Sequence, residues 1–218
     1  MTSTTGNRAI DPTRSVIDRG ARRLPTQERS RLRCNRVLDA AADLVDRHGP
    51  DTITTARIAA AARVSIGWLY DFFPNREAVF DAIVERSLDK VVPIVESVHR
   101  NCANQPWAVV IDSVIDTLFD FYRTEPGFRV LWFSRFQSAQ MIEVNRRHDL
   151  ADARAAVHRL EHEGLRLRGV DPETALHLVI GIIDKGLDLA FLLDPNGHRG
   201  VVEETKAAVR AYLGTYAA

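Results

Sequence analysis

The stretch from Ile53 to Val79, ITTARIAAAARVSIGWLYDFFPNREAV, decides which fold the rest of the sequence predicts. Thr54 is a hydroxyl residue of the kind that caps a helix start, and the apolar residues after it recur at helical spacing. Ser65 can cap a second short helix, which has to end before Pro74 because proline steers the preceding residue out of the helical conformation. The stretch therefore predicts a short helix, a tight turn and a second short helix, followed by the start of a third.

This arrangement is that of a helix-turn-helix, whose second helix enters the major groove of DNA. The total charge gives no signal for a nucleic acid, because 29 basic residues balance 29 acidic residues. The distribution is more informative, since nine arginines but only three acidic residues lie between Arg8 and Arg36. Such a basic block can neutralise phosphates or be a solvated tail, and the sequence leaves both interpretations open.

The length and composition are those of an ordinary globular protein. A chain of 218 residues with 45% hydrophobic residues can form one large domain or two small ones. Cys34 and Cys102 lack metal or redox spacing, which fits small buried hydrophobes in a reducing cytosol better than a redox switch. The sequence has neither an apolar signal core nor an uncharged apolar run that could span a membrane. We therefore expect a cytoplasmic protein with no membrane partner. We expect no metal or cofactor either, because no further ligand completes the pair His158 and His162.

Helical periodicity continues to the end of the chain, and no stretch alternates at period two. Pro93 is expected to end or kink the fourth helix, and a long helix is expected from about Met141 to Leu167 with Gly169 ending it. Three aspartates that recur every four residues in the helix after Pro106 are expected to be solvated: Asp112, Asp116 and Asp120. The sequence thus predicts an all-α chain of about nine helices, with an amino-terminal three-helix helix-turn-helix head and a carboxy-terminal helical body.

Short motifs occur at fixed spacing in and around the helix-turn-helix. They are Val45-Asp46-Arg47-His48-Gly49, Thr54 to Ala59, Val64-Ser65, Leu69-Tyr70, Phe73-Pro74-Asn75-Arg76 and Glu77-Ala78. With these motifs the sequence resembles the TetR/AcrR-type transcriptional regulators, strongly from Arg33 to Glu85 and more weakly beyond. The resemblance implies an all-α homodimer with a flexible Arg-rich arm at 1–25, a DNA-binding domain at 26–80, and an effector-binding and dimerisation domain at 81–218.

The resemblance also implies a function. It implies a sequence-specific transcriptional regulator, not an enzyme, that represses by binding a palindromic double-stranded DNA operator. An apolar or aromatic small-molecule effector, bound in the carboxy-terminal domain, would release it, and activation in place of repression stays open. A helical protein-interaction adaptor whose head no longer reads DNA is the alternative. An enzyme is disfavoured because the sequence has no nucleophile elbow, phosphate-binding glycine loop or metal-spaced cluster.

The DNA contacts of the family carry over to residues of the helix-turn-helix. Residues that match phosphate contacts are Thr55, Tyr70 and Arg76, and those on the base-reading surface are Ser65, Ile66, Gly67 and Trp68, with Arg57 adding polar readout. Ile66 and Trp68 depart from the family, because neither can make the bidentate hydrogen bonds that identify guanine or adenine. We hypothesise that specificity depends on apolar contact with thymine methyl groups and on DNA shape. The alternatives are that Trp68 packs inside the head and that Tyr70 packs in its core.

Two further residues of the head depart from the family. Arg63 occupies the turn where glycine is usual, and a left-handed conformation there would cost on the order of 1–2 kcal/mol. Either the turn differs, or the arginine is kept because it reaches a phosphate. Asp71 stands where histidine is common and is expected to point away from DNA, because a carboxylate near phosphates is unfavourable.

The body supplies candidates for the effector pocket and the dimer interface. Residues that can line an apolar pocket are Trp107, Phe119, Tyr122, Phe128, Trp132, Phe133, Phe136 and His148, although any single aromatic at helical spacing is more often core. Residues that can form a four-helix interface between subunits are Val179, Ile183, Gly186, Leu187, Ala190, Ala208 and Ala211. The alternative is that these faces are used inside one subunit.

Overall fold

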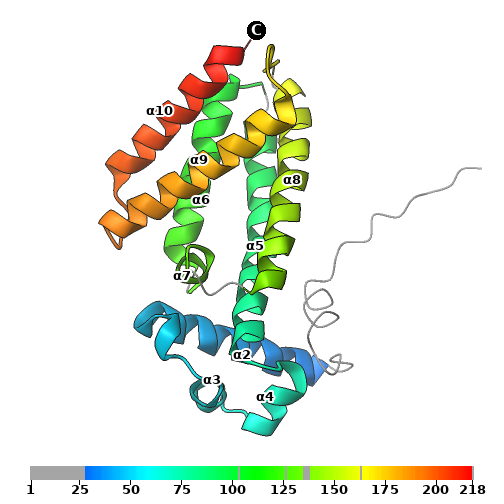
Figure 1. Cartoon of the computed structure of the whole chain (residues 1–218), viewed down its shortest axis with the longest axis vertical. Helices are drawn as coiled ribbons and strands as arrows, with labels where there is room; N and C mark the ends of the chain where they lie inside the picture. Colours follow the sequence, from blue (N-terminus) through cyan, green and yellow to red (C-terminus); the bar gives the residue numbers. More distant parts are fainter. Residues whose placement is uncertain (1–27, 103, 126, 135–137, 163, 218) are drawn as a thin grey trace, which may run out of the picture. The chain divides into compact units, whose positions relative to one another are not determined.

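The computed structural model describes residues 28–102, 104–125, 127–134, 138–162 and 164–217, so the arm expected at 1–25 lies outside the described residues. Over these residues the chain is all-α, as predicted, with nine α-helices, one 3₁₀ turn and a single isolated bridge between Leu167 and Ala217 (Figure 1). The elements are α2 (Glu28–His48), η1 (Pro50–Thr52), α3 (Thr55–Ala62), α4 (Ile66–Phe72), α5 (Arg76–Asn101), α6 (Trp107–Thr124), α7 (Phe128–Trp132), α8 (Ala139–His162), α9 (Pro172–Leu193) and α10 (Arg199–Tyr216).

The chain divides into two compact units. The first lies within Met1–Asp89 and Pro126–Ser138, and the second comprises Lys90–Glu125 and Ala139–Ala218. In the first unit α2 packs against α3 and contacts η1 and α7. Its core is formed by buried side chains of α2, α3, α4, α5 and α7, which include Val37, Val45, Ile58, Leu69, Phe80, Phe128 and Leu131.

The helix α7 belongs to the first unit although it lies in the middle of the carboxy-terminal sequence. Its cap Gly127 has a left-handed conformation (φ 69°) and lies directly against the backbone of Ala42 in α2. A Cβ atom at position 127 would be 2.6 Å from the carbonyl oxygen of Ala42, so only glycine permits this approach. Ser138, at the other end of the segment, donates its hydroxyl proton to Asp81 of α5 at 2.6 Å.

Two expected helix ends differ in the structure. The helix α5 continues through Pro93 to Asn101, because Pro93 is exposed and water can satisfy the carbonyl that the missing N–H leaves free. The helix α8 ends at His162, well before Gly169. Gly164 takes a left-handed conformation (φ 86°), and the N–H of Leu165 donates to the carbonyl of Leu160 at 2.8 Å. This is a Schellman termination, which stops the helix one turn early.

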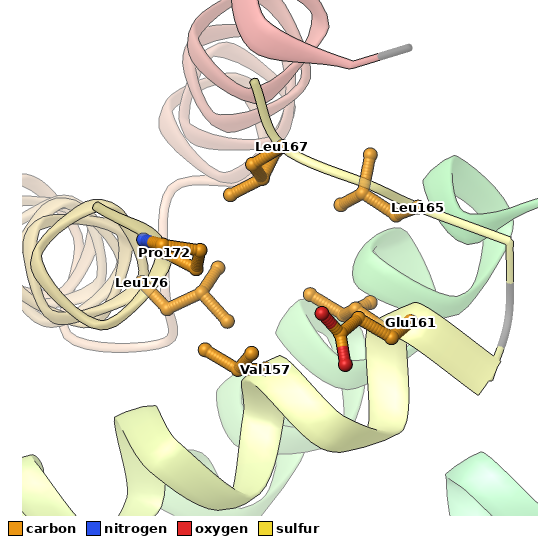
Figure 2. Close-up of a pocket in the computed structure, with 7 residues that line it drawn as sticks. Val157, Glu161, Leu165, Leu167, Pro172 and Leu176 are labelled. Carbon is orange, nitrogen blue, oxygen red and sulfur yellow. The ribbon is translucent and has the colours of Figure 1, made fainter. Parts of the chain in front are cut away.

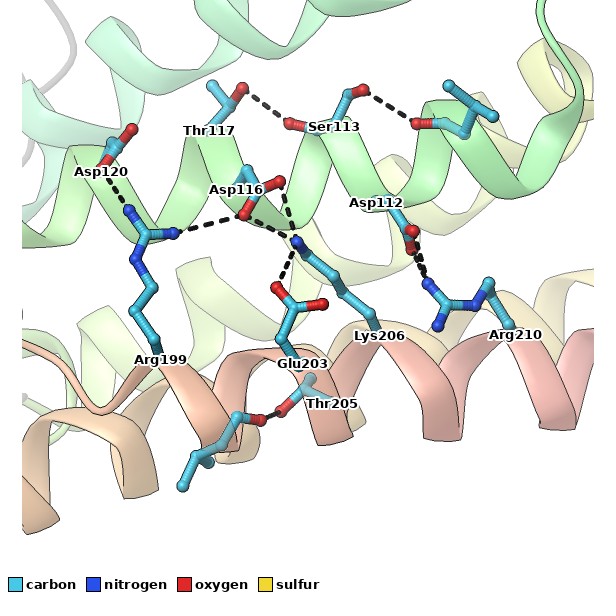
Figure 3. A network of polar contacts seen from close by, with 12 residues as sticks. Asp112, Ser113, Asp116, Thr117, Asp120, Arg199, Glu203, Thr205, Lys206 and Arg210 are labelled. Atoms are coloured by element: carbon cyan, nitrogen blue, oxygen red, sulfur yellow. Dashed lines mark hydrogen bonds and ion pairs between the residues drawn. The ribbon is translucent and has the colours of Figure 1, made fainter.

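The three aspartates of α6 are not simply solvated, which corrects the sequence prediction. Each is paired with a cation of α10: Asp112 with Arg210, Asp116 with Lys206 at 2.8 Å, and Asp120 with Arg199 at 3.7 Å (Figure 3). A helical repeat of four on α6 therefore matches a basic face of α10, a pairing that no local pattern shows.

Lys206 is the most buried member of this network. Only 7% of its side chain is exposed, and it contacts both Asp116 and Glu203. Burial opposes the charge, but the hydrogen bonds with the two carboxylates outweigh it and raise the pKa of Lys206 above its ordinary value. The ammonium therefore stays charged in the interior and ties α10 to α6.

We predict that Gly127→Ala destabilises the protein by at least about 2 kcal/mol, because alanine adds both left-handed strain and a clash with Ala42. The midpoint of thermal unfolding, followed by circular dichroism, is expected to fall by about 4 °C or more. Gly214→Ala is the matched control, since Gly214 is helical and has open space around it. The control is expected to melt at or slightly above the wild-type temperature. Equal melting of Gly127→Ala and wild type would contradict the close approach.

Candidate nucleic-acid interface

The helix-turn-helix forms as the sequence predicts, with a hydroxyl cap at the start of each helix. The Oγ1 of Thr54 accepts from the N–H of Arg57 at 3.2 Å, and the Oγ of Ser65 accepts from the N–H of Trp68 at 3.1 Å. Asn75 caps α5 in the same way, accepting from the N–H of Ala78 at 2.8 Å. Because each cap satisfies donors that the first helical turn leaves free, the three helix starts are fixed locally.

The turn between α3 and α4 is left-handed at Arg63, with φ 54° and ψ 46°. The N–H of Val64 donates to the carbonyl of Ala59 at 3.0 Å, and the N–H of Arg63 donates to that of Ala60 at 3.2 Å. This is the termination in which glycine is preferred, so the turn itself is not different from the usual one. The arginine is kept despite the strain, and its side chain is exposed.

Tyr70 and Thr55, two of the predicted phosphate contacts, meet at one point. The hydroxyl of Tyr70 on α4 lies 2.9 Å from the hydroxyl of Thr55 at the start of α3. Tyr70 is 41% exposed, so the ring is not part of the head's core. The hydrogen bond joins the two helices and presents two hydroxyls together at the surface.

The exposed start of α4 is apolar, whereas Tyr70 and Asp71 are exposed farther along the helix. Ile66 is 42% exposed, and a side chain at Gly67 would meet nothing within 4 Å. Trp68 is half-buried, and its ring lies 4.5 Å from that of Phe72 at an angle of 34°. Trp68 therefore packs on the head with one side and leaves the other accessible, which is intermediate between the two interpretations of the sequence.

Arg76 and Arg57 bind the turn at residues 50–53 in the free chain. Nη1 of Arg76 donates to the carbonyl of Ile53 at 3.1 Å and, at 3.4 Å, to that of Pro50. Nη1 of Arg57 donates to the carbonyl of Thr52 at 2.8 Å. Arg76 is only 26% exposed, and its guanidinium also pairs with the neighbouring Glu77. No local pattern predicts the hydrogen bonds of Arg76, because the carbonyls that accept them lie more than twenty residues earlier in the chain.

The predicted pocket residues are divided between the two compact units. Trp107, Phe119 and Tyr122 lie in the second unit, whereas Phe128, Trp132 and Phe133 lie in the first. The side chains of Phe136 and His148 lie outside the described residues.

Two of the second-unit aromatics have defined roles in packing. Phe119 stacks on Phe191 with ring centroids 5.2 Å apart, and the guanidinium of Arg199 lies 4.3 Å from the Phe119 ring centroid. The hydroxyl of Tyr122 donates to Asp184 at 3.2 Å. Both rings are buried, so they serve as core in this conformation.

A small pocket is present elsewhere in the second unit, where the end of α8 and the following loop face the start of α9 (Figure 2). None of its residues was predicted to bind an effector. The lining is apolar except for one carboxylate: Val157, Leu160, Glu161, Leu165, Leu167, Pro172 and Leu176.

Most of the predicted interface residues of α9 are used inside the subunit. Val179, Ile183, Leu187 and Ala190 are buried within the second unit. A Cβ atom at Gly186 would lie 2.1 Å from the hydroxyl of Thr205, so this glycine allows α10 to pack closely against α9. Ala208 and Ala211 of α10 are exposed. The apolar side chains that α9 leaves exposed are others: Leu178, Leu189, Leu192 and Leu193.

The described residues contain no group of three or more His, Cys, Asp or Glu side chains placed to hold a metal ion. No helix among them is long and apolar enough to cross a membrane. Cys34 is buried, which raises the pKa of its thiol to about 11 and leaves it protonated and unreactive.

Two family descriptions match the chain. "Bacterial regulatory proteins, tetR family" matches residues 37–83, which contain the helix-turn-helix, and "Tetracyclin repressor-like, C-terminal domain" matches residues 105–217. The chain belongs to the TetR family. The second match covers more than half of the chain, so the membership extends well beyond the DNA-binding motif that carried the resemblance in the sequence.

Individual relatives agree with this membership. A TetR-family transcriptional regulator from Streptomyces coelicolor has 29% sequence identity and a TM-score of 0.63, over 84% of this TetR-family chain and 99% of the other. SmeT, the repressor of a Stenotrophomonas maltophilia multidrug efflux pump, shares the fold with a TM-score of 0.62 at 23% identity, over 85% and 90%. The nucleoid occlusion factor SlmA of Haemophilus ducreyi is 29% identical over 96 residues, which are 44% of this chain. The match spans only 46% of SlmA, so it concerns less than half of that protein.

We predict that Arg76→Gln lowers the free energy of unfolding by about 1–3 kcal/mol, because it removes a donor for two backbone carbonyls and leaves that of the buried Ile53 without its side-chain partner. Urea denaturation measures this change. Arg47→Gln is the matched control, since Arg47 forms only an exposed pair with Asp43 and is expected to change stability by less than about 0.5 kcal/mol. If both variants unfold at the wild-type urea concentration, Arg76 does not hold the turn.

We predict that Arg63→Gly raises the free energy of unfolding by about 1 kcal/mol, because glycine adopts the left-handed turn without strain. Arg63→Ala removes the same side chain but keeps the Cβ atom, and it is expected to leave stability close to wild type. Comparison of the two variants by urea denaturation separates backbone strain from any effect of the side chain. A glycine variant no more stable than the alanine variant would show that the turn is unstrained.

Proposed function

We propose that this protein is a sequence-specific, double-stranded-DNA-binding transcriptional regulator that acts in the cytoplasm. The observation that carries the proposal is the surface of the helix-turn-helix. The hydrogen-bonded hydroxyls of Tyr70 and Thr55 lie at the surface, and α4 has a capped start and an exposed apolar residue, Ile66, in its first turn. Hydroxyls of this kind bind phosphates and fix register, whereas the side chains of α4 meet base edges.

Base reading by α4 is proposed to depend on apolar contact and DNA shape. Ile66 and the accessible side of Trp68 fit the C5-methyl group of thymine, and neither offers a donor or acceptor for guanine. Arg57 and Arg76 donate hydrogen bonds to the turn before α3 in the free chain. To contact DNA, either arginine has to break these hydrogen bonds or use another N–H group of the same guanidinium. Arg63, exposed at the turn, is available to a phosphate.

A homodimer is proposed as the active form, because two copies of α4 about 34–36 Å apart can address successive major grooves of a palindromic operator. The exposed leucines of α9 and the small exposed residues of α10, Ala208 and Ala211, are the apolar surface available for it. A single helix end with several exposed leucines is unfavourable in water and is stabilised when a partner covers it.

Repression released by an apolar or aromatic small molecule is the proposed mode of regulation. Two structural neighbours, at 22% and 18% identity, were crystallised with triclosan and with resorcinol, which are both small aromatic molecules. The helix α7 packs on α2 in the first unit, whereas α6 and α8 on either side of it in the sequence belong to the second. The helix α5 also runs without a break from the first unit into the second, so a ligand-induced movement of α5 can reach the head, provided that the ligand binds the two states unequally. No enzymatic activity is proposed.

The test is fluorescence-anisotropy binding of the purified protein to the intergenic DNA that flanks its own gene, over a series of salt concentrations. We expect tight binding that weakens steeply with salt and prefers the native fragment to a scrambled one. An adaptor that no longer reads DNA would bind both fragments weakly and equally, and an enzyme would show turnover without DNA. The native fragment then serves to screen small aromatic molecules for release.

We predict that replacing thymine by uracil at the base pairs under α4 weakens binding about fourfold per contacted methyl group, since one buried CH₂ contributes about 0.8 kcal/mol. The Ile66→Ala variant is expected to lose this sensitivity at the position that Ile66 contacts, which a double-mutant cycle of protein and DNA measures. Thymine-to-uracil changes outside the operator half-sites are the control. A strong dependence on guanine opposite Trp68 would contradict apolar readout.

A further inference from the structure

The first half of α2 carries three arginines that have no partner in the described structure. Arg31, Arg33 and Arg36 are all exposed. None of them forms a hydrogen bond, an ion pair or a ring contact with another described residue. Three uncompensated cations within six residues therefore face solvent.

Three of the four acidic residues of the same helix lie away from these charges. Glu28 is its first residue, whereas Asp39, Asp43 and Asp46 lie in its second half. There Asp39 pairs with Arg86 of α5 at 2.7 Å and Asp43 pairs with Arg47 at 3.8 Å, so these two carboxylates are directed to other cations. Residues 29–36 carry four arginines and no acid, which makes this part of the helix strongly basic.

The orientation of the arginines agrees with an outward-facing surface. Arg33 and Arg36 are three positions apart and share one side of the helix. Cys34, Val37 and Ala41, which are buried, define the side that packs in the head, and the exposed arginines flank it. The same basic character continues upstream in the sequence, where arginines recur from Arg8 onwards with few acidic residues between them.

We propose that Arg31, Arg33 and Arg36 bind the phosphates of DNA flanking the base pairs that α4 reads. The proposal rests on the proposed function, because it extends the same interface beyond the helix-turn-helix. In the homeodomain, another three-helix DNA-binding head, the arm that leads into the first helix reaches the minor groove beside the major groove that the third helix occupies. Contacts of this kind carry no sequence information but add affinity by releasing counterions.

The experiment uses the full-length chain and its operator fragment. The triple variant Arg31→Gln, Arg33→Gln, Arg36→Gln removes the basic surface, and glutamine keeps the helix propensity. The matched control neutralises three exposed arginines of the second unit, Arg100→Gln, Arg166→Gln, Arg168→Gln, so that both proteins lose the same net charge. Circular dichroism melting checks that both variants fold like the wild type, as expected for exposed side chains.

The measured quantity is the slope of log affinity against log salt concentration. Each lost phosphate contact lowers its magnitude by about 0.9, so the triple variant is expected to lose between about 0.9 and 2.7, and the control variant none. The preference for native over scrambled DNA is expected to stay unchanged in both, because phosphate contacts do not specify sequence. Equal slopes for the triple variant and the control would overturn the proposal.

A second arm of the experiment locates the contact on the DNA. Shortening the duplex on both sides to the bare operator removes the flanking phosphates, so wild-type affinity is expected to fall and the affinity of the triple variant to stay the same. An equal loss for both proteins would overturn the assignment to the flanks. If the wild type itself shows no specific, salt-sensitive binding, the proposed function fails; if it does and the triple variant matches the control, only this inference fails.

Discussion

The helix-turn-helix depends on a preceding turn whose backbone carbonyls are bound by arginine side chains. Ile53 is buried, and its carbonyl oxygen accepts from Arg76 at the start of α5. The carbonyl of Pro50 accepts from Arg76 and from the N–H of Ile53, and that of Thr52 accepts from Arg57 of α3. A buried carbonyl without a donor costs about 1–3 kcal/mol, so the turn, the start of α3 and the start of α5 must keep their places together. The Arg76 guanidinium also lies over the ring of Phe80, 5.4 Å from its centroid, which holds the cation in position. Groups outside the helix-turn-helix therefore fix where it begins.

The helices were predictable because the signals for them are local. Thr54 and Ser65 each cap the helix that the sequence assigned to it, and Asn75 caps α5 in the same way, since a cap needs only a hydroxyl or amide next to the first turn. The helix ends were harder to predict, because they depend on the surroundings of each residue. Pro93, expected to end or kink its helix, does not end α5, and it is exposed. The helix α8 ends before the first of two left-handed glycines, Gly164, and not at the second, Gly169. The sequence shows neither the solvent exposure nor the choice between two glycines.

In the candidate site, too, local patterns predicted individual residues but not the contacts between residues far apart in the sequence. The sequence analysis named Thr55 and Tyr70 separately as predicted phosphate contacts, but their hydrogen bond joins two helices and has no sequence signature. The apolar stripe of α9 was visible, yet a helix that is apolar on more than one face does not reveal which face its own subunit uses. Val179 and Leu187 pack inside, whereas Leu189 and Leu192 do not. The aspartates of α6 needed knowledge of α10, about ninety residues away.

The insertion of α7 into the first unit has a consequence for the order of folding. Phe128 and Leu131 complete a core whose other members come from residues 34–84, so the unit is discontinuous along the chain. During synthesis the helix-turn-helix emerges well before this segment. Until Phe128 and Leu131 have been made, the apolar surface that they cover stays exposed to water. Contacts of long sequence separation slow folding and lengthen the exposure of such surfaces. The head thus reaches its final packing only after α6 has been made, which couples the maturation of the two units in time.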